Sequence, residues 1–135
     1  MRVTRAMGAL VMLVGLTTVA ACRPVQGVAC PAIGYIASVD VSLAEAWPGR
    51  ADLRLDVACV TPTGGGTPCD LQGASRGPTW HGTSGNPPAA VIATVRRGDV
   101  VLDTQTVALS SRVTDYPYGP QCGGPVEATG TVPAP

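Results

Sequence analysis

Lysine and phenylalanine are absent from this chain of 135 residues, and aromatic residues make up only 4% of it. All nine basic residues are therefore arginines, and nine acidic residues balance them to a formal net charge of zero. A nucleic-acid-binding protein needs a basic patch, so this balance predicts no nucleic-acid partner. With so few aromatic side chains, the core must consist mainly of Val, Ala, Leu and Ile, which bury less area per residue.

The apolar run near the N-terminus is too short for a transmembrane helix. Residues 6–21 carry no charge, but a helix that spans a bilayer needs about twenty apolar residues. Arg2 and Arg5 precede the run, and a basic start followed by an uncharged stretch is typical of a secretory signal peptide. The run ends in Val19-Ala20-Ala21-Cys22, which resembles the lipobox of bacterial lipoproteins. In that motif a cysteine after small residues receives a diacylglycerol and becomes the new N-terminus.

This resemblance implies three parts: a signal peptide at 1–21, a lipidated N-terminus and tether at 22–29, and one domain at 30–135. The domain would lie outside the cytoplasm, held on the membrane by Cys22. The alternative is an ordinary secreted protein cleaved near Ala21. The chain has five cysteines, which cannot all pair within one chain, and lipidation accounts for the odd one. Removing residues 1–21 leaves 135 − 21 = 114 residues, enough for a single small domain.

The rest of the chain has the periodicity of strands. Apolar and polar residues alternate at 35–43, 51–59 and 126–132, which predicts strands with one buried face. Residues 90–95 and 100–109 predict a hairpin with Gly98 in its turn, where a positive φ is needed.

The segment 61–88 is rich in glycine and proline. There we expect only a short strand at 68–72, paired with the 51–59 strand, and Trp80 against the core. No helical periodicity is sustained, so five or six short strands predict an all-β fold. The expected fold is a small antiparallel β-sandwich of immunoglobulin-like architecture, stapled by disulfides.

Four cysteines remain after Cys22, and they allow three pairings. If 51–60 and 67–72 are hairpin partners, Cys59 lies close to Cys69, and Cys30 is left to pair with Cys122. A four-cysteine zinc site is the alternative, but it requires thiolates at short paired spacings such as C-x-x-C. The chain has no such spacing, so we expect disulfides, with no metal and no cofactor.

Several features together resemble a group of small actinobacterial lipoproteins of unknown function. They are the lipobox, Gly34 shortly after Cys30, the Cys59 and Cys69 pair, and the run Tyr116-Pro117-Tyr118-Gly119-Pro120-Gln121-Cys122. Members of that group often have asparagine where Tyr118 stands, a cysteine next to Gly34, and another directly after Cys122. Tyr35 takes the first of these cysteine positions here, and no cysteine follows Cys122. The loss of both fits the loss of one whole disulfide and supports pairing Cys30 with Cys122. The group implies no activity.

One catalytic motif occurs in the chain. Residues 73–77 match the G-x-S-x-G pattern of a nucleophile elbow around Ser75, and His81 lies nearby. That elbow needs a strand-to-helix turn in a large α/β sheet, and an acid between the serine and the histidine. No acid lies between Ser75 and His81. We therefore interpret the motif as a chance match, and Arg97-Gly98-Asp99 as a hairpin turn rather than an integrin ligand.

Three aromatic residues are candidates for binding. Trp80, Tyr116 and Tyr118 lie in segments expected to be loops, where exposed aromatic rings offer large rigid contact areas. The alternative is that the core needs all of them. We expect a membrane-anchored, non-catalytic interaction module that contacts an envelope protein or polysaccharide. A small envelope hydrolase using Ser75 or His81, and a purely structural envelope component, remain the alternatives.

Overall fold

The computed structural model describes residues 27, 29–60 and 69–135. Cys22, the signal peptide predicted at 1–21 and most of the tether predicted at 22–29 lie outside the described residues. Eight strands and two short 3-10 helices follow one another: β1 (Ala37–Leu43), η1 (Arg50–Asp52), β2 (Arg54–Cys59), β3 (Gln72–Arg76), β4 (Thr79–Ser84), β5 (Ala90–Arg97), β6 (Val100–Ala108), β7 (Ser110–Val113), η2 (Pro120–Cys122) and β8 (Val126–Val132).

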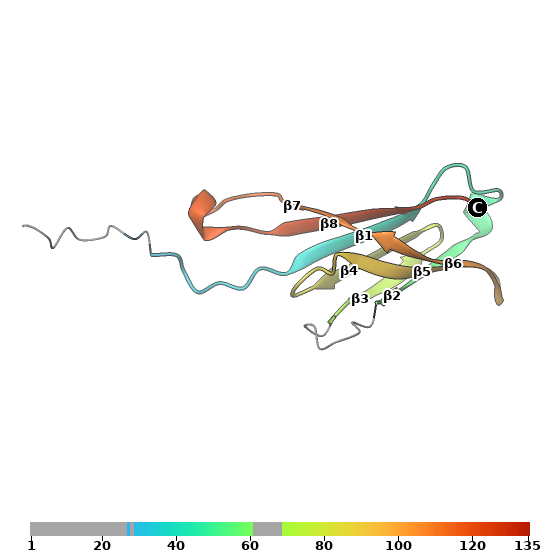
Figure 1. The fold of residues 1–135 in the computed structure, drawn as a ribbon, viewed down its shortest axis with the longest axis horizontal. Coiled ribbons are helices and arrows are strands. Elements are labelled where there is room, and N and C mark those ends of the chain that lie inside the picture. The colour runs from blue at the N-terminus through green and yellow to red at the C-terminus, as the bar shows by residue number, and fades with distance from the viewer. Residues whose placement is uncertain (1–26, 28, 61–68) are drawn as a thin grey trace, which may run out of the picture.

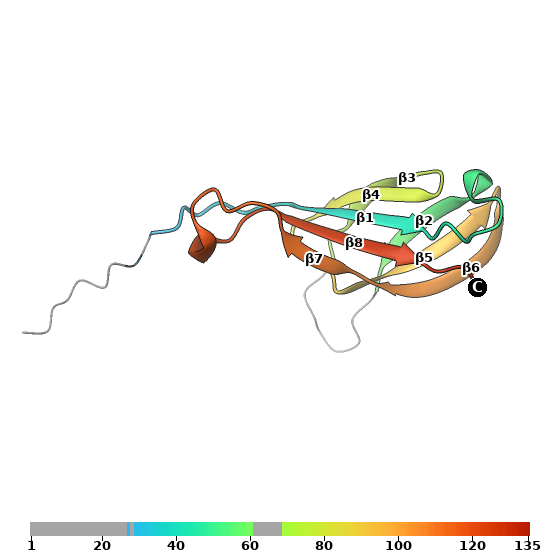
Figure 2. The same ribbon diagram turned by 90° about the horizontal axis from the view of Figure 1, so that it is seen from above.

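The strands form two sheets that pack face to face (Figures 1 and 2). One sheet has five strands in the order β3-β4-β1-β8-β7, and the other has three in the order β2-β5-β6. The predicted all-β sandwich stapled by disulfides is confirmed. Neighbouring strands are antiparallel except β1 and β8, the first and last, which run parallel.

Strict alternation in the strands produces the core. In β1, Val39, Val41 and Leu43 are buried between the sheets, while the residues between them face solvent. Such alternation is expected of a sheet with one dry face. The buried core cluster comprises Val39, Val41, Leu43, Trp47, Leu53, Leu55, Trp80, Val91, Ala93, Val95, Val107, Ala128 and Val132. Trp47 closes one end of this core, where its Nε1 donates a hydrogen bond to the carbonyl oxygen of Val132 at 3.1 Å.

The hairpin of β3 and β4 corrects the prediction for 61–88. The expected strand at 68–72 is found at Gln72–Arg76, and it pairs with β4, not with the 51–59 strand. Gly73 and Gly82 face each other across this pair, and a Cβ on either would overlap the ring of Trp80. The glycines therefore make room within strands for an indole, whereas a glycine-rich composition had predicted a loop.

The predicted hairpin at 90–109 is confirmed as β5 and β6, joined through Gly98 at φ 58°. The chain then passes from β6 directly into β7, which lies in the other sheet (Figure 2). Strand β7 was not predicted, because its four residues are all exposed and show no alternation in burial. Consecutive strands thus form an edge of each sheet: β6 in the three-stranded sheet and β7 in the five-stranded sheet.

Two disulfides cross-link the domain. Cys59 pairs with Cys69 and Cys30 pairs with Cys122, with Cα atoms 5.9 Å and 5.3 Å apart. The expected pairs are present, but the reason given for the first was wrong, because Cys59 and Cys69 are not hairpin partners. Cys59 ends β2 in the three-stranded sheet, and Cys69 precedes β3 in the five-stranded sheet. This disulfide therefore links the two layers.

Candidate functional site

The chain on either side of the Cys30–Cys122 disulfide forms a narrow extension at one end of the sandwich. We call it the stalk and define it as residues 29–36 and 114–125; it is drawn out beyond the sheets in Figure 1. Its second segment is a loop closed at its base, where the backbone N–H of Thr114 donates to the carbonyl oxygen of Pro125 at 2.9 Å. A turn from Tyr116 to Gly119 and the helix η2 shape the loop's tip. The disulfide fastens the first segment to this loop.

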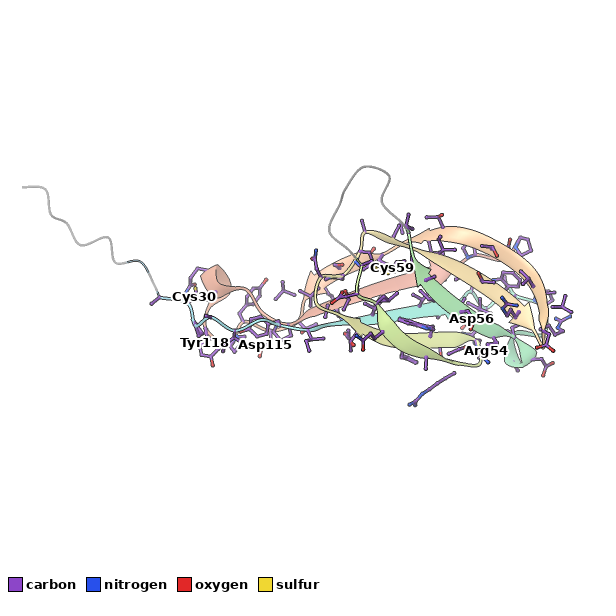
Figure 3. All side chains as sticks on the ribbon, turned by 90° about the horizontal axis from the view of Figure 1, so that it is seen from below. Cys30, Arg54, Asp56, Cys59, Asp115 and Tyr118 are labelled. Carbon is purple, nitrogen blue, oxygen red and sulfur yellow. A yellow bond between two sulfur atoms is a disulfide. The ribbon has the colours of Figure 1, made fainter. Side chains whose placement is uncertain are left out.

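Both candidate tyrosines lie in the stalk and are exposed. The exposed fractions are 47% for Tyr116 and 49% for Tyr118, and Figure 3 shows Tyr118 close to Cys30 at the stalk's end. The sequence interpretation missed two further exposed apolar residues in the stalk, Ile33 at 47% and Ile36 at 68% exposure. The run Ile33-Gly34-Tyr35-Ile36 between Cys30 and the first strand was the signal that could have found them. The stalk thus presents four large apolar side chains to its surroundings.

The stalk carries almost no charge. Within its two segments Asp115 is the sole acidic or basic residue, and its Oδ1 accepts a hydrogen bond from the backbone N–H of Tyr116 at 2.7 Å. An extension with exposed isoleucines and tyrosines and so little charge is suited to an apolar or amphipathic surface. It offers little to a ligand recognised through ion pairs.

Trp80, the third aromatic candidate, is not on the surface. Its side chain is buried at 4% exposure within the core cluster. The expectation that it packs against the core is confirmed, and its ring is not accessible to a partner. Of the three aromatic residues predicted as binding candidates, only Tyr116 and Tyr118 are therefore accessible to a partner.

The structure places Ser75 and His81 on opposite faces of the five-stranded sheet. Ser75 is the register partner of the buried Trp80, and its Oγ accepts a hydrogen bond from the backbone N–H of Leu55 in the other sheet at 3.3 Å. His81 points outward, where its Nδ1 pairs with the carboxylate of Asp40 on β1. The two side chains therefore cannot act as nucleophile and base on one substrate.

The outer face around His81 is hydrophilic. Outward positions of β1, β4 and β8 carry hydroxyl and charged side chains: Ser38, Asp40, Ser42, Thr79, His81, Thr83, Glu127, Thr129 and Thr131. Beside them, Arg112 of β7 pairs with Glu127 at 2.5 Å. A sheet with one face on the core and one in water is expected to look like this. The pairing of His81 with Asp40 was not predicted, because only the register of β1 and β4 brings them together.

The Arg97-Gly98-Asp99 tripeptide occupies the turn between β5 and β6, at the end of the sandwich opposite the stalk. Arg97 is engaged within the molecule, since its Nη2 donates to the carbonyl oxygen of Pro48 at 3.1 Å. The tripeptide therefore has a structural role: it forms the turn, and Arg97 attaches that turn to the loop between β1 and η1.

A small polar network fixes the chain after Cys69. The carboxylate of Asp70 accepts hydrogen bonds from the Ser84 hydroxyl at 2.7 Å and from the backbone N–H of Gly85 at 2.9 Å. These two donors, the hydroxyl first, hold the pKa of Asp70 below its ordinary value. The network ties the start of the β3 segment to the end of β4, which is a structural role.

Over 27, 29–60 and 69–135, no group of three or more His, Cys, Asp or Glu side chains could hold a metal ion. The same residues contain no helix of the length and apolarity needed to cross a membrane. A scan against protein-family models, a search of curated proteins and a search of solved structures each found no match for this chain.

Proposed function

We propose that this chain is a lipoprotein anchored through Cys22 on the outer face of the bacterial cytoplasmic membrane. On this proposal it is a non-catalytic interaction module whose stalk contacts a component of the cell envelope. The observation that carries the proposal is the pairing of the cysteines. Four of the five form the two disulfides, so Cys22 has no cysteine of the same chain left to pair with, and lipidation gives it a role.

Two further observations support the proposed location. Disulfides that staple a small domain persist outside the cytosol, where thiols are not kept reduced. Cys30, the first disulfide cysteine, lies at the end of the domain where the described chain begins (Figure 3). An anchor eight residues earlier would hold the domain by its stalk.

The contact role is supported by the arrangement of side chains. Four large exposed apolar side chains lie on the stalk, and the exposed run Val100-Val101-Leu102 lies apart from it on β6. Ser75 and His81, the residues of the alternative hydrolase, lie on opposite faces of a sheet. We therefore prefer an interaction module to an enzyme.

The anchoring is tested with Cys22→Ser in a bacterial host that processes lipoproteins. We expect the unsubstituted chain in the membrane fraction, with a mass that lacks residues 1–21 and includes a diacylglyceryl group. The Cys22→Ser chain should keep its leader or be released without lipid. Thr18→Ser, which leaves Val19 to Cys22 intact, is the matched control and should behave like the unsubstituted chain. An unmodified sulfur at Cys22 in the unsubstituted chain would contradict the proposal.

A further inference from the structure

We propose that the stalk lies on the surface of the bilayer, with Ile33, Ile36, Tyr116 and Tyr118 in the interfacial layer between headgroups and acyl chains. This inference rests on the proposed lipidation of Cys22 and names the envelope component that the stalk contacts.

The composition of the stalk matches the interfacial layer. Tyrosine is enriched at the membrane–water boundary, because its ring is apolar and its hydroxyl remains hydrated. Tyr116, Tyr118, Ile33 and Ile36 are each about half exposed or more, so they can enter that layer without rearrangement of the core. Asp115 is the single charge in the stalk's two segments, so insertion desolvates little charge.

The place of the stalk favours the same partner. Cys30 and Tyr118 lie at one end of the long axis, and Arg54, at the start of β2, lies toward the other (Figure 3). The eight residues from Cys22 to Cys30 span at most about 29 Å when fully extended. An anchored Cys22 therefore keeps Cys30, at the end of the stalk, within about 29 Å of the bilayer.

Tethering lowers the affinity that this contact needs. A short connection between two binding sites gives the second site an effective concentration on the order of millimolar. Four half-exposed apolar side chains would give weak binding to a membrane from solution. Next to an anchor, the same weak partition is enough to keep the stalk on the surface.

The outer face of the five-stranded sheet is more polar than the stalk. Its outward positions carry hydroxyl and charged side chains, which prefer water to the interfacial layer. We therefore expect the stalk to contact the bilayer and the outer face of the five-stranded sheet to remain in water.

The test uses the full chain, lipidated in its host and reconstituted into phosphatidylethanolamine–phosphatidylglycerol vesicles with or without brominated acyl chains. Tyr118→Trp places a fluorescent reporter in the stalk. Val100→Trp is the matched control, because Val100 is 63% exposed and starts β6 at the opposite end. Trp47 and Trp80 are buried in the core, so their emission is a constant background that the unsubstituted chain measures.

We expect brominated lipid to quench the tryptophan introduced by Tyr118→Trp and to leave that introduced by Val100→Trp unchanged. Quenching of both would mean that the module lies flat, and quenching of neither that the stalk stays off the membrane. A blue shift that depends on protein concentration and not on bromine would assign the stalk to a second copy of the chain. Each of these three results would overturn the inference.

Hydrogen–deuterium exchange tests the same inference on the unsubstituted chain, so the result does not depend on whether the tryptophan variants fold. Backbone amides of 29–36 and 114–119 should exchange with deuterium more slowly in vesicles than in the unlipidated Cys22→Ser chain in solution. Amides of the β5–β6 turn should exchange equally in both, and equal exchange in the stalk as well would contradict the inference. The mass of the purified protein separates the two proposals. Absence of the lipid overturns both, whereas a lipidated chain with an unprotected stalk overturns only this one.

Discussion

The indole ring of Trp80 occupies the space that a side chain at Gly82 would fill, two residues further along β4. A Cβ at Gly82 would overlap the ring, and it would also lie 2.5 Å from the carbonyl oxygen of Gln72 on the neighbouring strand. The ring cannot withdraw, because it is buried between the two sheets. The close approach of Trp80 to its own strand therefore depends on glycine at this position.

Gly82→Ala should lower the free energy of unfolding by about 1–3 kcal/mol, the usual cost of forcing an extra carbon into a packed core. Trp80→Ala should cost about 3–5 kcal/mol, as for other large buried side chains. Urea unfolding followed by circular dichroism measures both. Gly34→Ala is the control, because a Cβ there meets nothing within 4 Å, and it should leave stability almost unchanged. A Gly82→Ala variant as stable as the control would show that the ring position is wrong.

The hairpin of β3 and β4 could not be predicted from the sequence, unlike most of the other strands. Alternation of apolar and polar residues predicted β1, β2 and β8, and the glycine turn with its apolar flanks predicted β5 and β6. Strands β3 and β4 lack that pattern, since Gly73 and Gly82 occupy inward positions where an apolar side chain would mark a strand. Strand β7 lacks it because all four of its residues are exposed.

The candidate site was predictable in part for a similar reason. Tyr116 and Tyr118 lie in a proline-bearing segment, where exposure of aromatic residues is expected, and both are exposed. Trp80 lay in a segment of the same composition but is buried. That Ile33 and Ile36 share the stalk with the tyrosines depends on the Cys30–Cys122 disulfide, which joins segments ninety-two residues apart. Contacts of that sequence separation leave no local pattern.

The two disulfides should contribute unequally to stability. On the loop-entropy model, the cross-link at a separation of 92 residues contributes about 4.7 kcal/mol at most, and that at a separation of 10 residues about 3 kcal/mol at most. Small domains have a net stability of about 5–15 kcal/mol. The fully reduced domain should therefore be marginally stable or unfolded.

Thermal melts with and without a reductant test this prediction. The double variant Cys30→Ser, Cys122→Ser should melt at a lower temperature than Cys59→Ser, Cys69→Ser. A variant with all four substitutions is the control and should show no response to the reductant. An oxidised domain whose melting curve is unchanged by reduction would contradict the prediction.

Asp70 should make stability depend on pH at the acidic end. Its hydrogen bonds from Ser84 and Gly85 lower its pKa in the folded state below the ordinary value of 3.8. A carboxyl whose pKa is depressed by folding stabilises the folded state above its unfolded pKa. That contribution is lost as the pH falls from 3.8 through the lower folded value.

Ser84→Ala removes the first of these causes and should raise the pKa of Asp70 toward 3.8. Carboxyl chemical shifts from an NMR titration measure this pKa directly. Unfolding measured between pH 5 and pH 2 should show a smaller acid-induced loss of stability in Ser84→Ala than in the unsubstituted domain. Thr83→Ala, on the opposite face of the same strand, should leave the titration of Asp70 unchanged. An equal pKa in all three proteins would show that the Ser84 hydroxyl does not act on Asp70.

Ser75→Ala should change stability and not chemistry. The Ser75 hydroxyl accepts a hydrogen bond from Leu55 at 3.3 Å and donates one to the carbonyl oxygen of Gly77 at 3.3 Å. Their loss should cost about 0.5–1.5 kcal/mol each at most. The cost should be at the lower end, because the Leu55 N–H also donates to the carbonyl oxygen of Gly77 at 3.2 Å.

Any hydrolysis of generic esters by the oxidised domain should be the same in Ser75→Ala and in the unsubstituted protein. His81→Gln is the companion variant, because His81 contacts Asp40 on the outer face and lies across the sheet from Ser75. Its effect on stability should stay within about 1 kcal/mol, because the contact between His81 and Asp40 is exposed to solvent. A nucleophile facing the core and a histidine facing solvent cannot share a substrate in this fold, so neither substitution should affect turnover. If either one abolished a measured turnover while the domain remained folded, the hydrolase would replace the interaction module.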